Sequence, residues 1–165
     1  MIKVQITPEM REEATRLSKE MGALRNSITE GEGNIVGFLG ELIAQQVLGG
    51  MIDHTYDYDI LLDDFLTTID VKTKKTTKTP LPHYACSVAE YNTKQKCDYY
   101  CFTRVKDDLQ VGWYLGLYKK EAYFKDACRL AKGDLDPDNN FTVKADCYNL
   151  PISNLMLDIR VNPNI

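Results

Sequence analysis

The sequence predicts a single domain of the α/β (α+β) class over residues 1–165. At 165 residues and 18.8 kDa the chain fits one domain with a sizeable core, and its 44% hydrophobic and 27% charged residues are ordinary for a globular protein. Two segments near the N-terminus have the apolar spacing of helices, whereas several later segments have the alternation or aromatic content of strands. We therefore expect helices and strands to be mixed within one domain.

The first elements are predicted to be a strand and an amphipathic helix. Residues 1–6 read as a short strand, and Thr7-Pro8 then opens a helix, with Thr7 at the N-cap and Pro8 at the first position, where its missing N–H costs nothing. Residues 22–33 are glycine-rich and are predicted to form a loop. The apolar face of the helix is formed by Met10, Ala14, Leu17 and Met21.

Residues 34–48 are predicted to form a second helix, which ends at Gly49-Gly50. Its apolar side chains surround most of the helix, which indicates burial on several sides. Gly37 and Gly40 make this helix thin, so that a strand or a substrate backbone could approach it closely, although tight helix packing would explain both glycines equally well.

Glu41 is the one charged residue of this apolar helix. A buried carboxylate must be paired, protonated or bound to a metal, because an isolated buried charge is costly. The alternative is a surface glutamate on a narrow polar strip with Gln45.

The segment from Tyr58 to Lys75 places two carboxylates and an ammonium near one another. In the predicted strand at residues 69–73, side chains alternate between faces, so Asp70 and Lys72 share one face while Ile69, Val71 and Thr73 share the other.

Residues 56–62 have strand propensity, and Asp63-Asp64-Phe65 is where the chain is expected to reverse. If the loop has four residues, Leu62 faces Thr67, and Asp59 then lies opposite Asp70 with side chains within about 5 Å of each other.

Such a carboxylate pair requires a compensating cation. Carboxylate oxygens suit Mg²⁺, which is commonly held by one or two carboxylates together with substrate phosphate oxygens. Lys72 could then neutralise charge on a phosphate or help to deprotonate a water. The alternative is a solvated edge hairpin with surface ion pairs, each contributing about 0 to 1 kcal/mol.

The rest of the chain is predicted to add strands and one helix around this hairpin. Residues 76–83 should form a loop because of their two prolines, and residues 85–96 fit no single element. The other expected elements are paired antiparallel strands at 98–105 and 110–118, a helix at 121–131, an edge strand at 141–150 and a surface segment at 151–165.

The composition favours a cytoplasmic protein that binds a polyanion at one place. No apolar run is long enough to span a membrane, the N-terminus lacks a signal peptide, and the five cysteines do not have the spacing of a disulfide framework. The net charge is −4, yet residues 72–96 contain six lysines against the single acid Glu90. This basic strip would steer a polyanion to one face, although a solvated lysine run explains the same count.

A zinc site is a further alternative. Its four candidate ligands are His83, Cys86, Cys97 and Cys101, although their spacing fits no familiar zinc motif. Cys86 could also be a nucleophile activated by His83, but no third group that would orient the pair is evident nearby.

The order of these motifs resembles that of the PD-(D/E)xK nuclease superfamily, including its phage-type and resolvase-like members. The resemblance is strongest over residues 34–75, with GFLGELIAQQVLGG around Glu41, YDIL around Asp59 and IDVKTK around Asp70 and Lys72. One departure is that Tyr58, rather than a proline, precedes Asp59, which leaves Asp57 as an alternative first carboxylate.

The resemblance implies a central mixed β-sheet of four or more strands flanked by helices, and Mg²⁺-dependent hydrolysis of DNA, with Mn²⁺ able to substitute for Mg²⁺. By carry-over, the metal ligands would be Glu41, Asp59, Asp70 and the Val71 carbonyl, and Lys72 would assist the attacking water. The basic residues expected to contact DNA are Lys74, Lys75, Lys78, Lys94 and Lys96.

The resemblance also implies a homodimer if the protein cuts symmetrically as junction resolvases do, and the host cytoplasm as its location if it is phage-encoded. Two other hypotheses stay open. One is a catalytically inactive DNA-binding or assembly module with the same fold, and the other is a zinc-stabilised structural protein.

Overall fold

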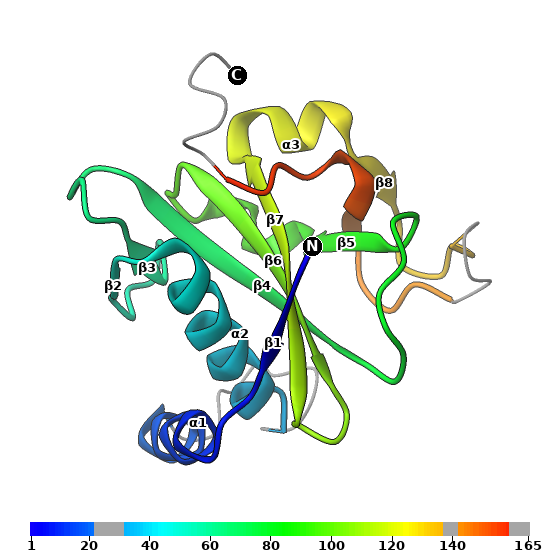
Figure 1. Ribbon diagram of the computed structural model, residues 1–165. Helices are drawn as coiled ribbons and strands as arrows, with labels where there is room; N and C mark the ends of the chain where they lie inside the picture. The colour runs from blue at the N-terminus through cyan, green and yellow to red at the C-terminus, as the bar shows by residue number, and fades with distance from the viewer. Residues whose placement is uncertain (22–31, 137–141, 159–165) are drawn as a thin grey trace.

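The computed structural model describes residues 1–21, 32–136 and 142–158, and a six-stranded mixed sheet lies at its centre (Figure 1). In spatial order the strands of this sheet are β1 (Ile2–Gln5), β7 (Val111–Lys119), β6 (Tyr99–Lys106), β4 (Thr68–Thr76), β3 (Ile60–Leu61) and β2 (Met51–Ile52). The pair β4 and β6 is parallel and the other pairs are antiparallel.

Helices and a smaller sheet cover the two faces of the central sheet. On one face α2 (Glu32–Leu48) packs across β4, β6 and β7, and α1 (Pro8–Met21) packs against α2. Over the other face lie α3 (Lys120–Asp126) and a three-stranded sheet of β5 (Ala85–Ala89), β9 (Cys147–Pro151) and β8 (Cys128–Leu130). The predicted α/β (α+β) fold with a mixed sheet flanked by helices is confirmed. None of the helices in these ranges is long and apolar enough to cross a membrane.

The N-terminal elements form as their sequence predicts. β1 pairs with β7 at the sheet edge, and Thr7 caps α1 because its Oγ1 accepts a hydrogen bond from the Met10 N–H at 3.3 Å. The expected loop at 22–33 lies mostly outside the described residues, and α2 begins at Glu32, two residues earlier than predicted.

Gly40 lets α2 approach the sheet closely. A Cβ atom at this position would overlap Thr73 Oγ1 of β4 and would lie 2.5 Å from Thr103 Oγ1 of β6. Gly37, by contrast, has nothing within 4 Å of such an atom. α2 then ends as predicted, since Gly49 has a φ of 78° and donates its N–H to the Gln45 carbonyl at 2.8 Å. Gly37 and Gly40 therefore have different surroundings.

The β3–β4 hairpin has the predicted register. Leu62 N–H donates to the Thr67 carbonyl at 3.0 Å, and Ile60 pairs with Ile69. The first strand is much shorter than the predicted 56–62, because residues 55–58 form a turn. In that turn Thr55 Oγ1 accepts hydrogen bonds from the backbone N–H groups of Asp57 and Tyr58.

The later elements are predicted with less success. The strands at 98–105 and 110–118 are confirmed as the antiparallel pair β6 and β7. The helix predicted at 121–131 is wrong in its second half, because Ala127 is extended and residues 128–130 pair with β9 as β8. The edge strand predicted at 141–150 is instead the middle strand of the small sheet, over residues 147–151.

Candidate functional site

Asp59 and Asp70 meet where β3 ends beside β4. Asp59 Oδ2 accepts a hydrogen bond from the Val71 N–H at 2.7 Å, and the Asp59 N–H donates to the Ile69 carbonyl at 2.9 Å, so Asp59 lies beside Asp70. Asp70 has only 2% of its surface exposed. The sequence-predicted pair is thus brought together in a buried position, with the open edge of β4 on one side.

Burial is the main reason that these aspartates hold protons more tightly than usual. It raises the pKa of both groups, and repulsion from Asp59 contributes to the value of about 7 for Asp70, against the lowering effect of Lys72.

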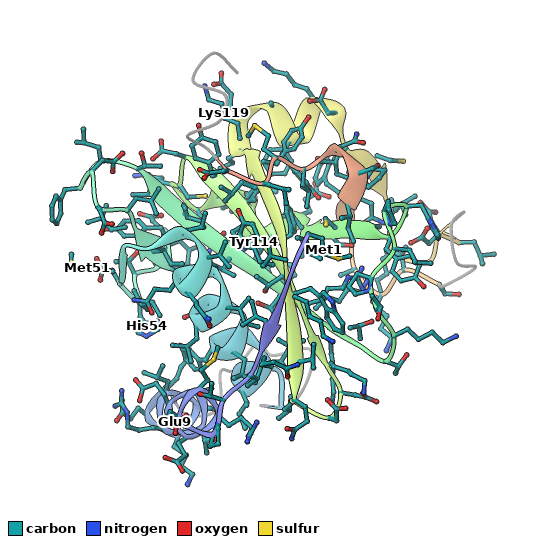
Figure 2. All side chains as sticks on the ribbon, viewed as in Figure 1. Met1, Glu9, Met51, His54, Tyr114 and Lys119 are labelled. Carbon is teal, nitrogen blue, oxygen red and sulfur yellow. The ribbon has the colours of Figure 1, made fainter. Side chains whose placement is uncertain are left out.

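Glu41 reaches the same site from α2. Burial raises the pKa of its carboxyl to about 8, with repulsion from Asp59 and Asp70 as the next causes. Its Oε2 lies 3.3 Å from Nδ1 of His54, whose ring packs edge-on against Phe38 (Figure 2). Glu41 is therefore a buried member of the carboxylate cluster rather than part of a surface strip with Gln45.

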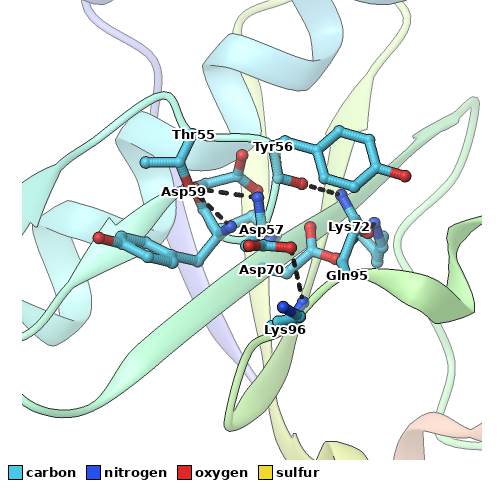
Figure 3. A network of polar contacts seen from close by, with 10 residues as sticks. Thr55, Tyr56, Asp57, Asp59, Asp70, Lys72, Gln95 and Lys96 are labelled. Carbon is cyan, nitrogen blue, oxygen red and sulfur yellow. Dashed lines mark hydrogen bonds and ion pairs between the residues drawn. The ribbon is translucent and has the colours of Figure 1, made fainter.

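Lys72 places its ammonium beside the cluster. Its Nζ lies 2.6 Å from Asp70 Oδ2 and donates a hydrogen bond to Gln95 Oε1 at 2.8 Å (Figure 3). The same Nζ lies 5.8 Å from the centre of the Tyr100 ring, which is buried below it. The predicted strand alternation is confirmed, since Ile69 and Val71 on the opposite face belong to the core under α2.

The donor set suits a hard divalent cation. Glu41 Oε2 and Asp70 Oδ2 are buried and make no hydrogen bond, although each lies near a nitrogen of His54 or Lys72. When all groups are ionised, three carboxylates and one ammonium leave two excess negative charges, which one Mg²⁺ would balance. The Val71 carbonyl faces the same open edge as its N–H, because both groups of a strand residue point to one side.

The cluster is not, however, arranged as a finished coordination shell. Within residues 1–21, 32–136 and 142–158, no group of three or more His, Cys, Asp and Glu side chains has the arrangement that holds a metal ion. The Lys72 ammonium lies against Asp70, and Asp59 is engaged by the Val71 N–H. Lys72 would have to withdraw from Asp70, and the carboxylates would have to lose their protons, before all three could hold one ion.

The structure separates the five lysines predicted to contact DNA. Lys74 shares the face of Asp70 and Lys72 and lies opposite Arg104 on β6, whereas Lys75 points to the other face of the sheet. Lys78 lies beyond the far end of β4. Lys94 and Lys96 lie on the other side of the site, in the segment that holds Gln95.

The potential zinc ligands do not come together. Cys101 is buried in the core under α2, whereas Cys86 is buried in the core on the other face of the sheet. His83 packs edge-on against Tyr84. Burial raises the pKa of the Cys86 thiol to about 12, which also disfavours Cys86 as a nucleophile.

Sequence reasoning missed two residues of the site and left one question open. These are His54, which follows the Gly49-Gly50 break, and Gln95, whose partner Lys72 is 23 residues away in the chain. Asp57 is excluded from the cluster, since its Oδ1 accepts the Lys96 N–H at 3.0 Å outside it. Asp59 is the aspartate that lies beside Asp70.

No protein-family model matches this chain, and a search of curated proteins finds no match either.

Proposed function

We propose that this protein is a metal-dependent deoxyribonuclease that hydrolyses DNA phosphodiester bonds, as its resemblance to the PD-(D/E)xK superfamily implies. The observation that supports this most is the position of Asp59 beside Asp70 and Lys72, with Glu41 of α2 close enough for the charges of both aspartates to raise its pKa. A fold gains no stability from three buried carboxylates with raised pKa values, so their presence favours a functional role.

Each residue of the cluster has a distinct role in this proposal. Glu41, Asp59, Asp70 and the Val71 carbonyl would hold Mg²⁺, which supplies Lewis acidity towards a phosphoryl oxygen and lowers the pKa of water. Lys72 is a cationic side chain beside Asp70, and its ammonium can stabilise the negative charge that develops on the phosphate.

Gln95 accepts a hydrogen bond from Lys72 through its side-chain carbonyl oxygen, which holds the ammonium beside Asp70. The burial of Asp70 strengthens its electrostatic interaction with Lys72. All five cysteines are free, which is compatible with the cytoplasm as the compartment of the proposed enzyme.

The proposal is tested by incubating plasmid and linear DNA with the purified protein in Mg²⁺, in Mn²⁺ and in EDTA. We expect cleavage with either metal and none in EDTA. Asp70→Asn and Lys72→Ala should each lower the rate by at least about 100-fold, because each removes charge from the centre of the site.

Lys106→Ala is a matched control, because Lys106 pairs with Asp108 on the exposed β6–β7 turn. It should cleave at the wild-type rate. Equal cleavage by Asp70→Asn and wild-type protein would refute the proposal. If the protein retains DNA but does not cut it under any metal condition, the inactive DNA-binding module is the correct function.

A further inference from the structure

Two segments that are distant in the chain meet at the border of the carboxylate site. Gln95 Nε2 donates to the Tyr56 carbonyl at 3.1 Å, and the Lys96 N–H donates to Asp57 Oδ1 at 3.0 Å. Figure 3 shows the loop that carries Tyr56 and Asp57 beside Gln95 and Lys72. Any strand of nucleic acid that reaches Lys72 on this side would pass over these two segments.

The two segments expose aromatic and basic side chains. Tyr56 is 74% exposed and Tyr91 is 56% exposed, and Lys94 and Lys96 are exposed as well. We call these four residues the rim. Tyr91 lies within about 8 Å of Gln95 along the 3₁₀ turn at Glu90–Lys94, given a rise of about 2 Å per residue.

The charges around the rim favour a polyanion. Within the described ranges, neither Lys94 nor Lys96 forms an ion pair. Two acids near them have other partners, since Asp57 accepts a hydrogen bond from the Lys96 N–H and Glu90 pairs with Arg129 at 2.7 Å. The two ammonium groups are therefore available to phosphates.

We propose that the rim binds single-stranded DNA, with Tyr56 and Tyr91 stacking on bases while Lys94 and Lys96 hold phosphates. This inference rests on the proposed nuclease function, because it names the form of DNA that the site receives. Exposed aromatic side chains combined with cations are the features by which proteins bind single strands without sequence preference.

Two observations favour a single strand over a duplex. The bases of a duplex stack on each other, so their faces are not available to Tyr56, whereas those of a single strand are. In addition, Asp70 is 2% exposed and the side chain of Lys72 is 15% exposed, so the scissile phosphate must enter the protein surface to reach them. A single strand is thin and flexible enough to do so.

The test measures binding without cleavage. Fluorescence anisotropy of a labelled oligo(dT) and of a labelled hairpin duplex would be recorded in EDTA, for wild type and for rim variants. We expect tighter binding of the single strand. Tyr56→Ala should weaken that binding about 5- to 100-fold, as expected for the loss of one stacked base.

Conservative variants separate stacking from other roles of Tyr56. Tyr56→Phe should bind the single strand as wild type does, whereas Tyr56→Leu, which keeps apolar surface without an aromatic face, should bind as weakly as Tyr56→Ala. Lys96→Ala should reduce the slope of log affinity against log salt by about 0.7, the contribution of one phosphate contact to a single strand. Lys19→Ala, on α1, should leave the slope unchanged.

The possible outcomes distinguish this inference from the proposed function. Equal or tighter binding of the duplex, wild-type binding by Tyr56→Leu, or no DNA binding at all would overturn the rim as a single-strand site, even if Mg²⁺-dependent cleavage is found. Selective single-strand binding that depends on Tyr56, without cleavage in any metal, would support the rim and refute the nuclease.

Discussion

Replacing Gly40 by alanine tests how α2 delivers Glu41 to the carboxylate site. In the structure a Cβ atom at Gly40 would overlap Thr73 Oγ1 and would lie 2.5 Å from Thr103 Oγ1. These two hydroxyls are also hydrogen-bonded to each other at 2.9 Å. Both threonines are β-branched and lie in paired strands, so neither can move far without disturbing the sheet.

The expected magnitude is the difference between two opposing effects. Alanine has a better helix propensity than glycine and would stabilise α2 by about 0.5 to 1 kcal/mol. Overpacking in a close-packed interior costs about 1 to 3 kcal/mol, and loss of the Thr73–Thr103 hydrogen bond costs about 0.5 to 1.5 kcal/mol more. Gly40→Ala should therefore lower the free energy of unfolding by about 0.5 to 4 kcal/mol.

Gly37→Ala is the matched control, since it lies three residues earlier in α2 and has open space around the added atom. It should raise the free energy of unfolding by about 0.5 to 1 kcal/mol. Urea denaturation measures both changes as shifts of the midpoint at constant m-value.

Any shift of α2 in Gly40→Ala would also move Glu41, the next residue, and a displacement of about 1 Å can lower activity about 100-fold. If Gly40→Ala proves as stable as Gly37→Ala, α2 does not pack on β4 and β6 as described. The position of Glu41 would then lose its support.

Three further predictions concern the site itself. In EDTA the free energy of unfolding should fall as pH rises from about 4 to about 8. The pKa values in the folded protein are about 8 for Glu41 and about 7 for Asp70, above the ordinary values of 4.5 and 3.8. The folded protein therefore keeps protons that the unfolded chain releases in this pH range. Urea titrations across this pH range measure it, and a flat profile would contradict it. Asp59→Asn should cleave DNA at least about 10-fold more slowly than Asp57→Asn, because only the former removes a carboxylate of the cluster; equal rates would reverse the assignment. Gln95→Ala should lower kcat about 10- to 100-fold with little change in KM, since it removes the oxygen that holds the Lys72 ammonium. Steady-state kinetics would reveal a KM effect instead if Gln95 served only to bind DNA.

Local sequence signals predicted the hairpin that forms half of the site. The alternation of residues 69–73 and the turn chemistry of Asp63 and Asp64 set the register, and this register alone places Asp59 beside Asp70. The single charge in an apolar helix likewise identified Glu41 as a residue that needs a partner. These predictions succeeded because each depends on neighbours within a few residues.

Contacts between distant segments could not be predicted in the same way. Gln95 reaches Lys72 only because β4 and β6 are parallel neighbours, which brings the residues before β6 next to the start of β4. His54 reaches Glu41 because the chain turns back after the end of α2. The helix predicted at 121–131 failed for a related reason, since pairing with β9 decides the conformation of residues 128–130.

The residue before Asp59 is a tyrosine, whereas the superfamily that the motifs resemble has a proline there. A proline there would restrict the backbone at the point where the chain enters β3. In this protein Tyr58 occupies the position, and hydrogen bonds of the Thr55 hydroxyl restrict the backbone there instead. This hydroxyl accepts hydrogen bonds from the N–H groups of Asp57 and Tyr58 at 3.2 and 3.0 Å, and it donates one to the Tyr58 carbonyl at 2.8 Å. A proline at position 58 would lack the N–H that Thr55 binds. The two solutions are therefore alternatives, and the absence of the proline does not weaken the placement of Asp59.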